Sequence, residues 1–240
     1  MEHVLDNPAW NALISGNKHL SNSNEQVRYF DKEVSPFAAF RENSADNFQL
    51  LYDMLPHNGP VLFVTPIETE IPAQWKVTGF IKGLQMVYEG PLIPQVINQE
   101  LIPLTEEHVP QMLSLTKLTN PGPFAAKTID FGHYYGIFEG TQLAAMTGQR
   151  FHPFEYAEIS AVCTHPDHAG KGYARLLLLQ QLHRIQSAGD IPFLHVRYDN
   201  ERAIKVYEDL GFVTRKNVYF YVMTKSLGVA LRNTRNTPQH

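Results

Sequence analysis

The sequence has very little cysteine: Cys163 is the only one in 240 residues, so no disulfide can form within the chain. It has no long apolar run, because the longest apolar stretches, Pro60–Val64 and Leu176–Leu179, are far shorter than the roughly 20 residues that cross a bilayer. The N-terminus lacks a basic start followed by an apolar run, so we expect no signal peptide. These features predict a cytoplasmic protein with no membrane partner.

An excess of charge of one sign is also missing. The net charge is −4, with 20 Lys and Arg against 24 Asp and Glu, so no overall basic field indicates a nucleic-acid partner. What the chain does have is apolar material, since 43% of its residues are hydrophobic, which is enough for a sizeable core. The length allows one large domain or two small ones.

The segment 89–94, Glu-Gly-Pro-Leu-Ile-Pro, is the best candidate for a domain boundary, because two prolines and a glycine disfavour continuous helix or strand. An ordinary connection inside one domain fits it equally well. We predict an accessory N-terminal α/β subdomain over residues 1–95 and a second domain over 96–240. Residues 48–64 and 182–196 share the order helix, break, proline and apolar strand, which raises the hypothesis that the first half is a degenerate copy of the second.

Hydrophobic periodicity and turn residues place the expected elements along the chain. Helices are predicted over 7–20, 44–54, 105–118, 125–131, 173–188 and 201–210, and strands over 26–30, 61–65, 75–88, 100–104, 134–138, 143–150, 156–164, 193–197 and 218–224.

The stretch from Glu158 to Arg175 carries the strongest chemical signal. A predicted strand runs into a loop that delivers Gly170 and Gly172 to the start of a predicted helix. Helix N-termini leave backbone N–H groups unpaired and carry partial positive charge, so they bind phosphate. Glycine lets the backbone approach an anion closely, and Lys171 adds a positive charge, although its side chain fits a solvent position equally well.

Two familiar phosphate loops do not fit this segment. The dinucleotide fingerprint needs a third glycine where Arg175 stands, and it needs a tighter turn than the five residues between Thr164 and Gly170. The Walker loop needs Ser or Thr after its lysine, whereas Gly172 follows Lys171.

The loop resembles the pyrophosphate loop of the GNAT N-acetyltransferase superfamily, whose pattern is a strand, Val-x-Pro and then Arg/Gln-x-x-Gly-x-Gly/Ala. Residues 164–166, Thr-His-Pro, and 169–174, Ala-Gly-Lys-Gly-Tyr-Ala, occupy these positions. Downstream, residues 200–212 match the family's Asn-x-x-Ala-x-x-x-Tyr-x-x-x-Gly-Phe signature. The resemblance covers about residues 100–225, and it departs from the family at Ala169, where an Arg or Gln is expected.

The resemblance implies a GNAT-type α/β fold, with a mixed, largely antiparallel sheet flanked by helices. It implies an N-acetyltransferase that moves the acetyl group of acetyl-CoA to an amine of a small molecule or peptide by direct attack. The identity of the amine, the length of the acyl chain and a homodimer stay open. The alternative is a non-catalytic acyl-CoA-binding sensor or scaffold, which the loss at Ala169 favours and the retained Tyr207 disfavours.

The resemblance also assigns residues to the coenzyme. The end of the strand holds the pantetheine arm and offers backbone donors to the carbonyl oxygen, while the loop and the helix start hold the pyrophosphate. The residues assigned in this way are Val162, Cys163, Thr164, Gly170, Lys171, Gly172, Tyr173, Ala174, Arg175 and Asn200. Tyr207 matches the family's tyrosine that protonates the departing thiolate, and a core aromatic is the alternative interpretation.

For the general base we nominate Glu158, because alternation along a strand places it on one face with Ser160, Val162 and Thr164, away from the more apolar face. A solvated carboxylate is an equal alternative, and Tyr156, His165 and a water chain are rivals for the role. Cys163 is expected to be buried. His165 and His168 have the spacing of metal ligands, but no second pair lies nearby, so we expect no metal site.

Overall fold

The computed structural model describes residues 3–95 and 100–226 and is built on an eight-stranded sheet of order β4-β11-β5-β10-β9-β8-β7-β6. Its strands are β4 (Val61–Thr65), β5 (Trp75–Tyr88), β6 (Ile102–Pro103), β7 (Tyr135–Glu139), β8 (Gln142–Gln149), β9 (Tyr156–Thr164), β10 (Ile191–Arg197) and β11 (Phe212–Lys225). Neighbouring strands pair antiparallel except β9 and β10, which are parallel. The prediction of a mixed, largely antiparallel sheet is confirmed.

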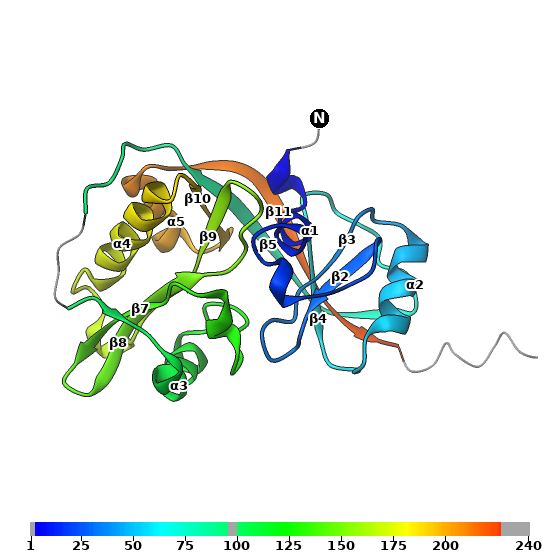
Figure 1. The fold of residues 1–240 in the computed structure, drawn as a ribbon, viewed down its shortest axis with the longest axis horizontal. Coiled ribbons are helices and arrows are strands. Elements are labelled where there is room, and N and C mark those ends of the chain that lie inside the picture. Colours follow the sequence, from blue (N-terminus) through cyan, green and yellow to red (C-terminus); the bar gives the residue numbers. More distant parts are fainter. Residues whose placement is uncertain (1–2, 96–99, 227–240) are drawn as a thin grey trace, which may run out of the picture.

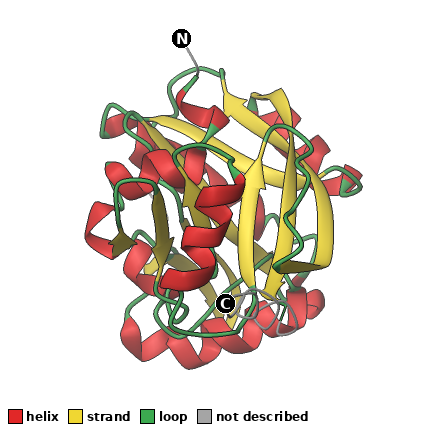
Figure 2. Ribbon diagram, turned by 90° about the vertical axis from the view of Figure 1, so that its right-hand side faces the viewer, coloured by secondary structure: helices red, strands yellow, loops and turns green. Residues whose placement is uncertain are grey.

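Helices cover both faces of this sheet, as Figure 2 shows from the side. On one face, Met112 and Leu115 of α3 (Val109–Thr119) share a buried cluster with α1 (Pro8–Ile14) and Cys163. On the other face, α4 (Tyr173–Ser187) and α5 (Glu201–Leu210) pack on Ala157 and Ile159 of β9. No helix in the described part of the chain is long and apolar enough to cross a membrane.

The remaining elements form a layer at the far end of the long strands. A three-stranded antiparallel sheet, β1 (Ser21–Ser23), β2 (Val27–Phe30) and β3 (Ala38–Phe40), packs with α2 (Ala45–Met54) around Phe48 and Phe63. Short 3-10 helices complete the chain at η1 (Val4–Asp6), η2 (Lys18–Leu20), η3 (Glu106–His108), η4 (Thr128–Phe131) and η5 (Pro166–His168).

The helix predicted over 7–20 is wrong in its second half. It ends at Ile14, because the N–H of Gly16 donates to the carbonyl of His152 (3.1 Å) instead of continuing the helical ladder. A Cβ at Gly16 would lie 2.5 Å from that oxygen, so only glycine fits this contact without a shift. The helix predicted over 125–131 is also shorter in the structure, where only the 3-10 turn η4 forms.

The candidate boundary near residue 95 does not separate two sheets. β5 comes from the N-terminal half of the chain, yet it lies between β10 and β11 of the C-terminal half. It pairs with β11 from Phe212↔Tyr88 to Lys225↔Trp75, and Figure 1 shows both strands crossing from the region of α4 and α5 to the region of α2. The division into residues 1–95 and 96–240 stays a prediction, and the strand order argues against independent folding.

A fragment of residues 96–240 tests this point. We expect it to show no cooperative thermal transition by circular dichroism, because it lacks the strand that joins β10 to β11 and leaves the facing edges of both without hydrogen-bond partners. The full chain is expected to unfold in one cooperative transition. A cooperative transition in the isolated fragment would show that the C-terminal half folds alone.

Candidate active site

The main cleft of the molecule opens where β9 and β10 part. The two strands pair only from Ile191↔Tyr156 to Phe193↔Glu158, and beyond these pairs a cleft of about 710 Å³ lies between them. Residues 159–164 of β9 and 195–197 of β10 line it, together with the start of α4 and one side of α5. A gap at the carboxyl ends of parallel strands is a common place for ligands, because no ladder fills it.

A β-bulge in β9 shapes the cleft wall. Met146↔Cys163 and Gly148↔Ser160 are paired, so β9 carries one more residue than β8 between these points, and Ala161 adopts φ 52. A bulge leaves the backbone groups of its extra residue without a ladder partner. These groups border the cleft at Ala161 and Val162, where they can donate to an oxygen of a bound ligand.

The bulge also changes which side chains share a face. The expectation that Glu158, Ser160, Val162 and Thr164 lie on one face is wrong, because the extra residue reverses the alternation after Ser160. Val162 packs with Ala157 and Ile159 under α4, whereas Cys163 packs on the face of α3. Cys163 is buried there, and burial raises the pKa of its thiol to about 12.

The glycine loop forms the anion-binding end of the cleft. Gly172 is the N-cap of the 15-residue helix α4 with φ 81, and Gly170 has φ 83, a region that favours glycine. A Cβ built at either glycine meets nothing within 4 Å, so the space above the loop is open to a ligand. The first-turn N–H groups of α4 have no partner within the helix and can donate to phosphate oxygens. The loop therefore fits the pyrophosphate of a coenzyme.

The structure brings nearly all of the residues predicted for the coenzyme to this one cleft. Those that line it are Val162, Cys163, Thr164, Gly170, Gly172, Tyr173, Ala174, Arg175 and Asn200. Lys171 does not, because its ammonium group lies 2.6 Å from a carboxylate oxygen of Glu139, to which the Tyr173 hydroxyl also donates. These hydrogen bonds, first that from Lys171, lower the pKa of Glu139. Ala169 lines the cleft and leaves room where the family carries Arg or Gln.

Tyr207 lies on the side of α5 that faces the cleft. Its ring packs on Phe212 with 5.9 Å between centroids, and the side chain is buried apart from an exposed fraction of 9%. Burial raises the pKa of the Tyr207 hydroxyl to about 12, so the group is protonated at neutral pH and can donate a hydrogen bond. Tyr207 is thus a core aromatic whose residue also borders the cleft, and its role as proton donor stays a prediction.

Glu158 does not line the cleft, and this position does not fit its assignment as general base. Its oxygens are fully buried and accept from Nε of Arg150 (2.9 Å), Nη2 of Arg150 (2.5 Å) and the N–H of Phe151 (3.2 Å). Burial alone would raise its pKa, but the charges and hydrogen bonds of Arg150 and His195 lower it to about 2. A carboxylate held so firmly in its ionised form is a poor proton acceptor.

His195 of β10 borders the cleft, but its ring nitrogens are both engaged. Its Nδ1 lies 2.7 Å from Glu158 and its Nε2 lies 3.1 Å from the side-chain nitrogen of Gln85. Gln85 has its orientation fixed, because its oxygen accepts from Arg215 (2.8 Å) and its nitrogen donates to the carbonyl of Leu5 (2.9 Å). Both ring nitrogens of His195 therefore have a partner, Glu158 at Nδ1 and Gln85 at Nε2, and the ring offers no free nitrogen to the cleft.

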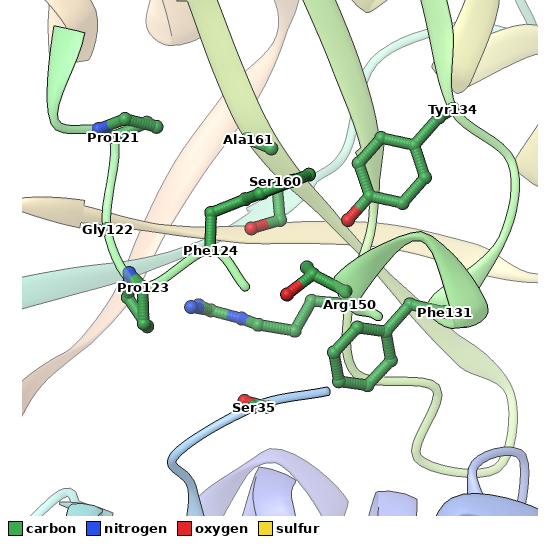
Figure 3. Close-up of a pocket in the computed structure, with 11 residues that line it drawn as sticks. Ser35, Pro121, Gly122, Pro123, Phe124, Phe131, Tyr134, Arg150, Ser160 and Ala161 are labelled. Atoms are coloured by element: carbon green, nitrogen blue, oxygen red, sulfur yellow. The ribbon is translucent and has the colours of Figure 1, made fainter. Parts of the chain in front are cut away.

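Arg150 is the cleft residue that the sequence did not reveal. It stands after the last residue of β8, belongs to no motif, and gains its place from contacts with residues distant along the chain. Its guanidinium carbon lies 4.9 Å from the ring centroid of Phe37 and 5.0 Å from that of Phe151. Arg150 borders both the cleft and a smaller pocket of about 10 Å³, which Figure 3 shows.

Comparisons with known proteins agree with this geometry. The family model described as FR47-like protein matches residues 134–221, from β7 into β11. A solved structure from Novosphingobium aromaticivorans, described as being from the GNAT family, is 32% identical, covers 94% of this chain and 100% of its own, and has a TM-score of 0.87. This chain belongs to the GNAT family. The resemblance, the fold and the enzyme class of acyltransferase predicted from the sequence are thereby confirmed.

Two further proteins are similar to this chain, one in part of its sequence and one in its fold. N-alpha-acetyltransferase RimI of Mycobacterium tuberculosis is 34% identical over 84 residues, which are 33% of this chain and 51% of RimI, so the match spans about half the length of that protein. A GCN5-related N-acetyltransferase from Kribbella flavida, 11% identical, covers 88% of this GNAT chain and 92% of its own with a TM-score of 0.59, and it shares the fold.

The charge on Glu158 predicts a pH dependence of stability. Its pKa is about 2 in the folded protein against 4.5 for a free side chain, so its contribution is complete above about pH 4.5 and is lost as the pH falls toward 2. A shift of this size corresponds to about 3 kcal/mol. We expect Glu158→Gln to lower the free energy of unfolding by about this amount at pH 7, and the difference from wild type to shrink below pH 4.5.

Urea denaturation at a series of pH values measures this difference. Glu155→Gln is the matched control, because Glu155 is exposed three residues earlier. A Glu158→Gln protein as stable as wild type at pH 7, or a constant difference down to pH 2, would contradict the buried ion pair.

Proposed function

We propose that this GNAT protein transfers the acetyl group of acetyl-CoA to the amine of a small molecule or peptide. The observation that carries this proposal is the cleft between β9 and β10, where a helix N-terminus, the unpaired backbone of a bulge and the protonated Tyr207 border one space. These groups correspond to the three needs of the reaction: an anchor for phosphates, donors for the carbonyl oxygen and a donor for the departing sulfur.

Coenzyme binding rests on the backbone more than on side chains. The first turn of α4 offers N–H groups beside Gly172, and Arg175 borders the cleft one turn further along. A volume of about 710 Å³ lies within the range of ligand sites, which is roughly 300–1,000 Å³. Because the backbone supplies the donors, alanine at position 169 weakens this end without removing it.

The proposed reaction uses uncharged hydrogen-bond donors rather than charged side chains. The backbone at Ala161 and Val162 donates to the carbonyl oxygen as negative charge develops there, and the Tyr207 hydroxyl donates to the sulfur as the bond to the acetyl carbon breaks. Neither Glu158 nor His195 offers a free basic atom to the cleft. In the proposed reaction the amine enters in its neutral form and releases its proton to solvent. We assign Glu158 the role of a positioning residue that holds Arg150.

Calorimetric titration with acetyl-CoA tests the coenzyme site. We expect saturable binding by the wild type, and binding about tenfold tighter for Ala169→Arg, because one added charged hydrogen bond to phosphate contributes roughly 1.5 kcal/mol. Ala188→Arg adds the same charge at the other end of α4 and is expected to bind like the wild type. Absence of binding would overturn the proposal, whereas binding without thiol release on a broad amine panel would support the sensor function instead.

Substitution of Tyr207 by Phe tests the donor to the sulfur. The ring packing on Phe212 stays, so we expect affinity for acetyl-CoA to change less than about threefold while kcat falls about 100-fold. Release of free thiol measures kcat, and Tyr52→Phe, far from the cleft beside Trp75, is the control. An unchanged kcat for Tyr207→Phe would remove this hydroxyl from the reaction.

A further inference from the structure

A second, smaller pocket continues from the cleft at the bulge. It shares Pro121, Arg150, Ser160 and Ala161 with the cleft, and the loop 121–124 and Ser35 of the N-terminal half close it. Figure 3 shows the Arg150 side chain extending across it, with Ser160 above and Ser35 below. Its volume of about 10 Å³ is close to the least that holds one water-sized group, so it accepts only a small polar end of a ligand.

Arg150 presents an unused donor edge to this pocket. Its Nε and Nη2 are committed to Glu158, and within residues 3–95 and 100–226 no protein acceptor faces Nη1. The aromatic rings of Phe37 and Phe151 lie against the guanidinium and hold its plane in place. A rigid cation with a free N–H edge is prepared to bind an oxygen of a ligand at little entropic cost.

The positive charge of Arg150 favours a negatively charged oxygen from the ligand. Arg150 is the one charged residue among those that line the pocket, and no carboxylate lines it. A positively charged group of a ligand would therefore find no anionic partner there. Glu158 balances the charge of Arg150 from behind, which makes the buried pair stable when the pocket holds no anion. A carboxylate fits the remaining edge, because guanidinium and carboxylate form charge-assisted hydrogen bonds.

We propose that the acceptor is a free amino acid, whose carboxylate binds Arg150 with one oxygen in the small pocket while its amino group lies in the cleft at the bulge. This inference rests on the proposed acetyl transfer. Ser160 and Ala161 border both spaces, so the two spaces adjoin and suit a ligand whose carboxylate and amine are separated by few atoms. A peptide N-terminus fits this arrangement less well, because its first residue carries an amide in place of the carboxylate that would pair with Arg150.

Matched acceptors test the proposal on the wild-type protein. Thiol release is measured with free amino acids, with their amides and with the corresponding amines that lack the carboxyl group. We expect kcat/KM for the best amino acid to exceed that of its amide at least 10-fold and that of its amine at least 100-fold. Amides, peptides or polyamines that match or exceed the acid would overturn the acceptor assignment and leave the acetyl transfer intact. Coenzyme binding without thiol release on any amine would overturn both.

Two variants test whether the preference for a carboxylate depends on Arg150 and the small pocket. Arg150→Lys keeps a cation beside Glu158 but loses the planar fork, so the acid-to-amine ratio is expected to fall at least 10-fold, through KM for the acid rather than kcat. Ser160→Val keeps the ion pair, fills the pocket and is expected to lower the same ratio, which covers the case of an unstable Arg150→Lys. Arg41→Lys, an exposed arginine outside the pocket, is the control. An unchanged ratio in both pocket variants would overturn the role of Arg150.

Discussion

The buried ion pair of Glu158 and Arg150 is the constraint around which the site is arranged. A fully buried carboxylate is tolerated only when it is paired and hydrogen-bonded. Glu158 meets this condition with three partners, Arg150 after β8, His195 on β10 and the N–H of Phe151. The pair therefore ties together the strands that flank β9 at the point where β9 and β10 separate. The cleft opens directly beyond this fixed point.

The same network reaches into the N-terminal half of the chain. His195 contacts Gln85 of β5, Gln85 accepts from Arg215 of β11, and Arg215 pairs with Asp6 (2.8 Å) in the first 3-10 turn. Phe37 packs on the guanidinium of Arg150 from the same half. The N-terminal half of the chain therefore supports the site through these polar contacts. It also contributes β5 to the central sheet.

What the sequence predicts well are the features that depend on local backbone geometry. The glycines at 170 and 172 and the helix that carries Tyr207 are visible as spacing, because each is fixed within a few residues of chain. The family resemblance adds their roles. Most element positions follow in the same way from periodicity, and the fold class follows from the resemblance.

The misassignments have two physical causes. The shared face is predicted incorrectly because a pattern of period two assumes an unbroken ladder, and the bulge at Ala161 moves Val162 and Thr164 to the face opposite Glu158. Glu158 itself is unavailable because Arg150 and His195 engage its carboxylate. Arg150 is missed because its role is created by contacts with Phe37 and Glu158, from different elements of the sheet and loops. The contact with Phe37 joins segments that are far apart in the sequence, so it exists only once the N-terminal half packs beside β8 and β9.

The two ends of the cleft depend on different kinds of group, backbone at one end and side chains at the other. In the proposed reaction, the coenzyme end uses backbone groups of α4 and β9, so alanine at position 169 is tolerated there. The proposed acceptor end uses Arg150 and Ser160 beside Ser35 from the other half of the chain. On this proposal, the choice of acceptor depends on side chains that a buried ion pair holds in place. The residues proposed for the coenzyme lie in short sequence motifs. The proposed acceptor pocket is assembled from separate segments only when the chain folds.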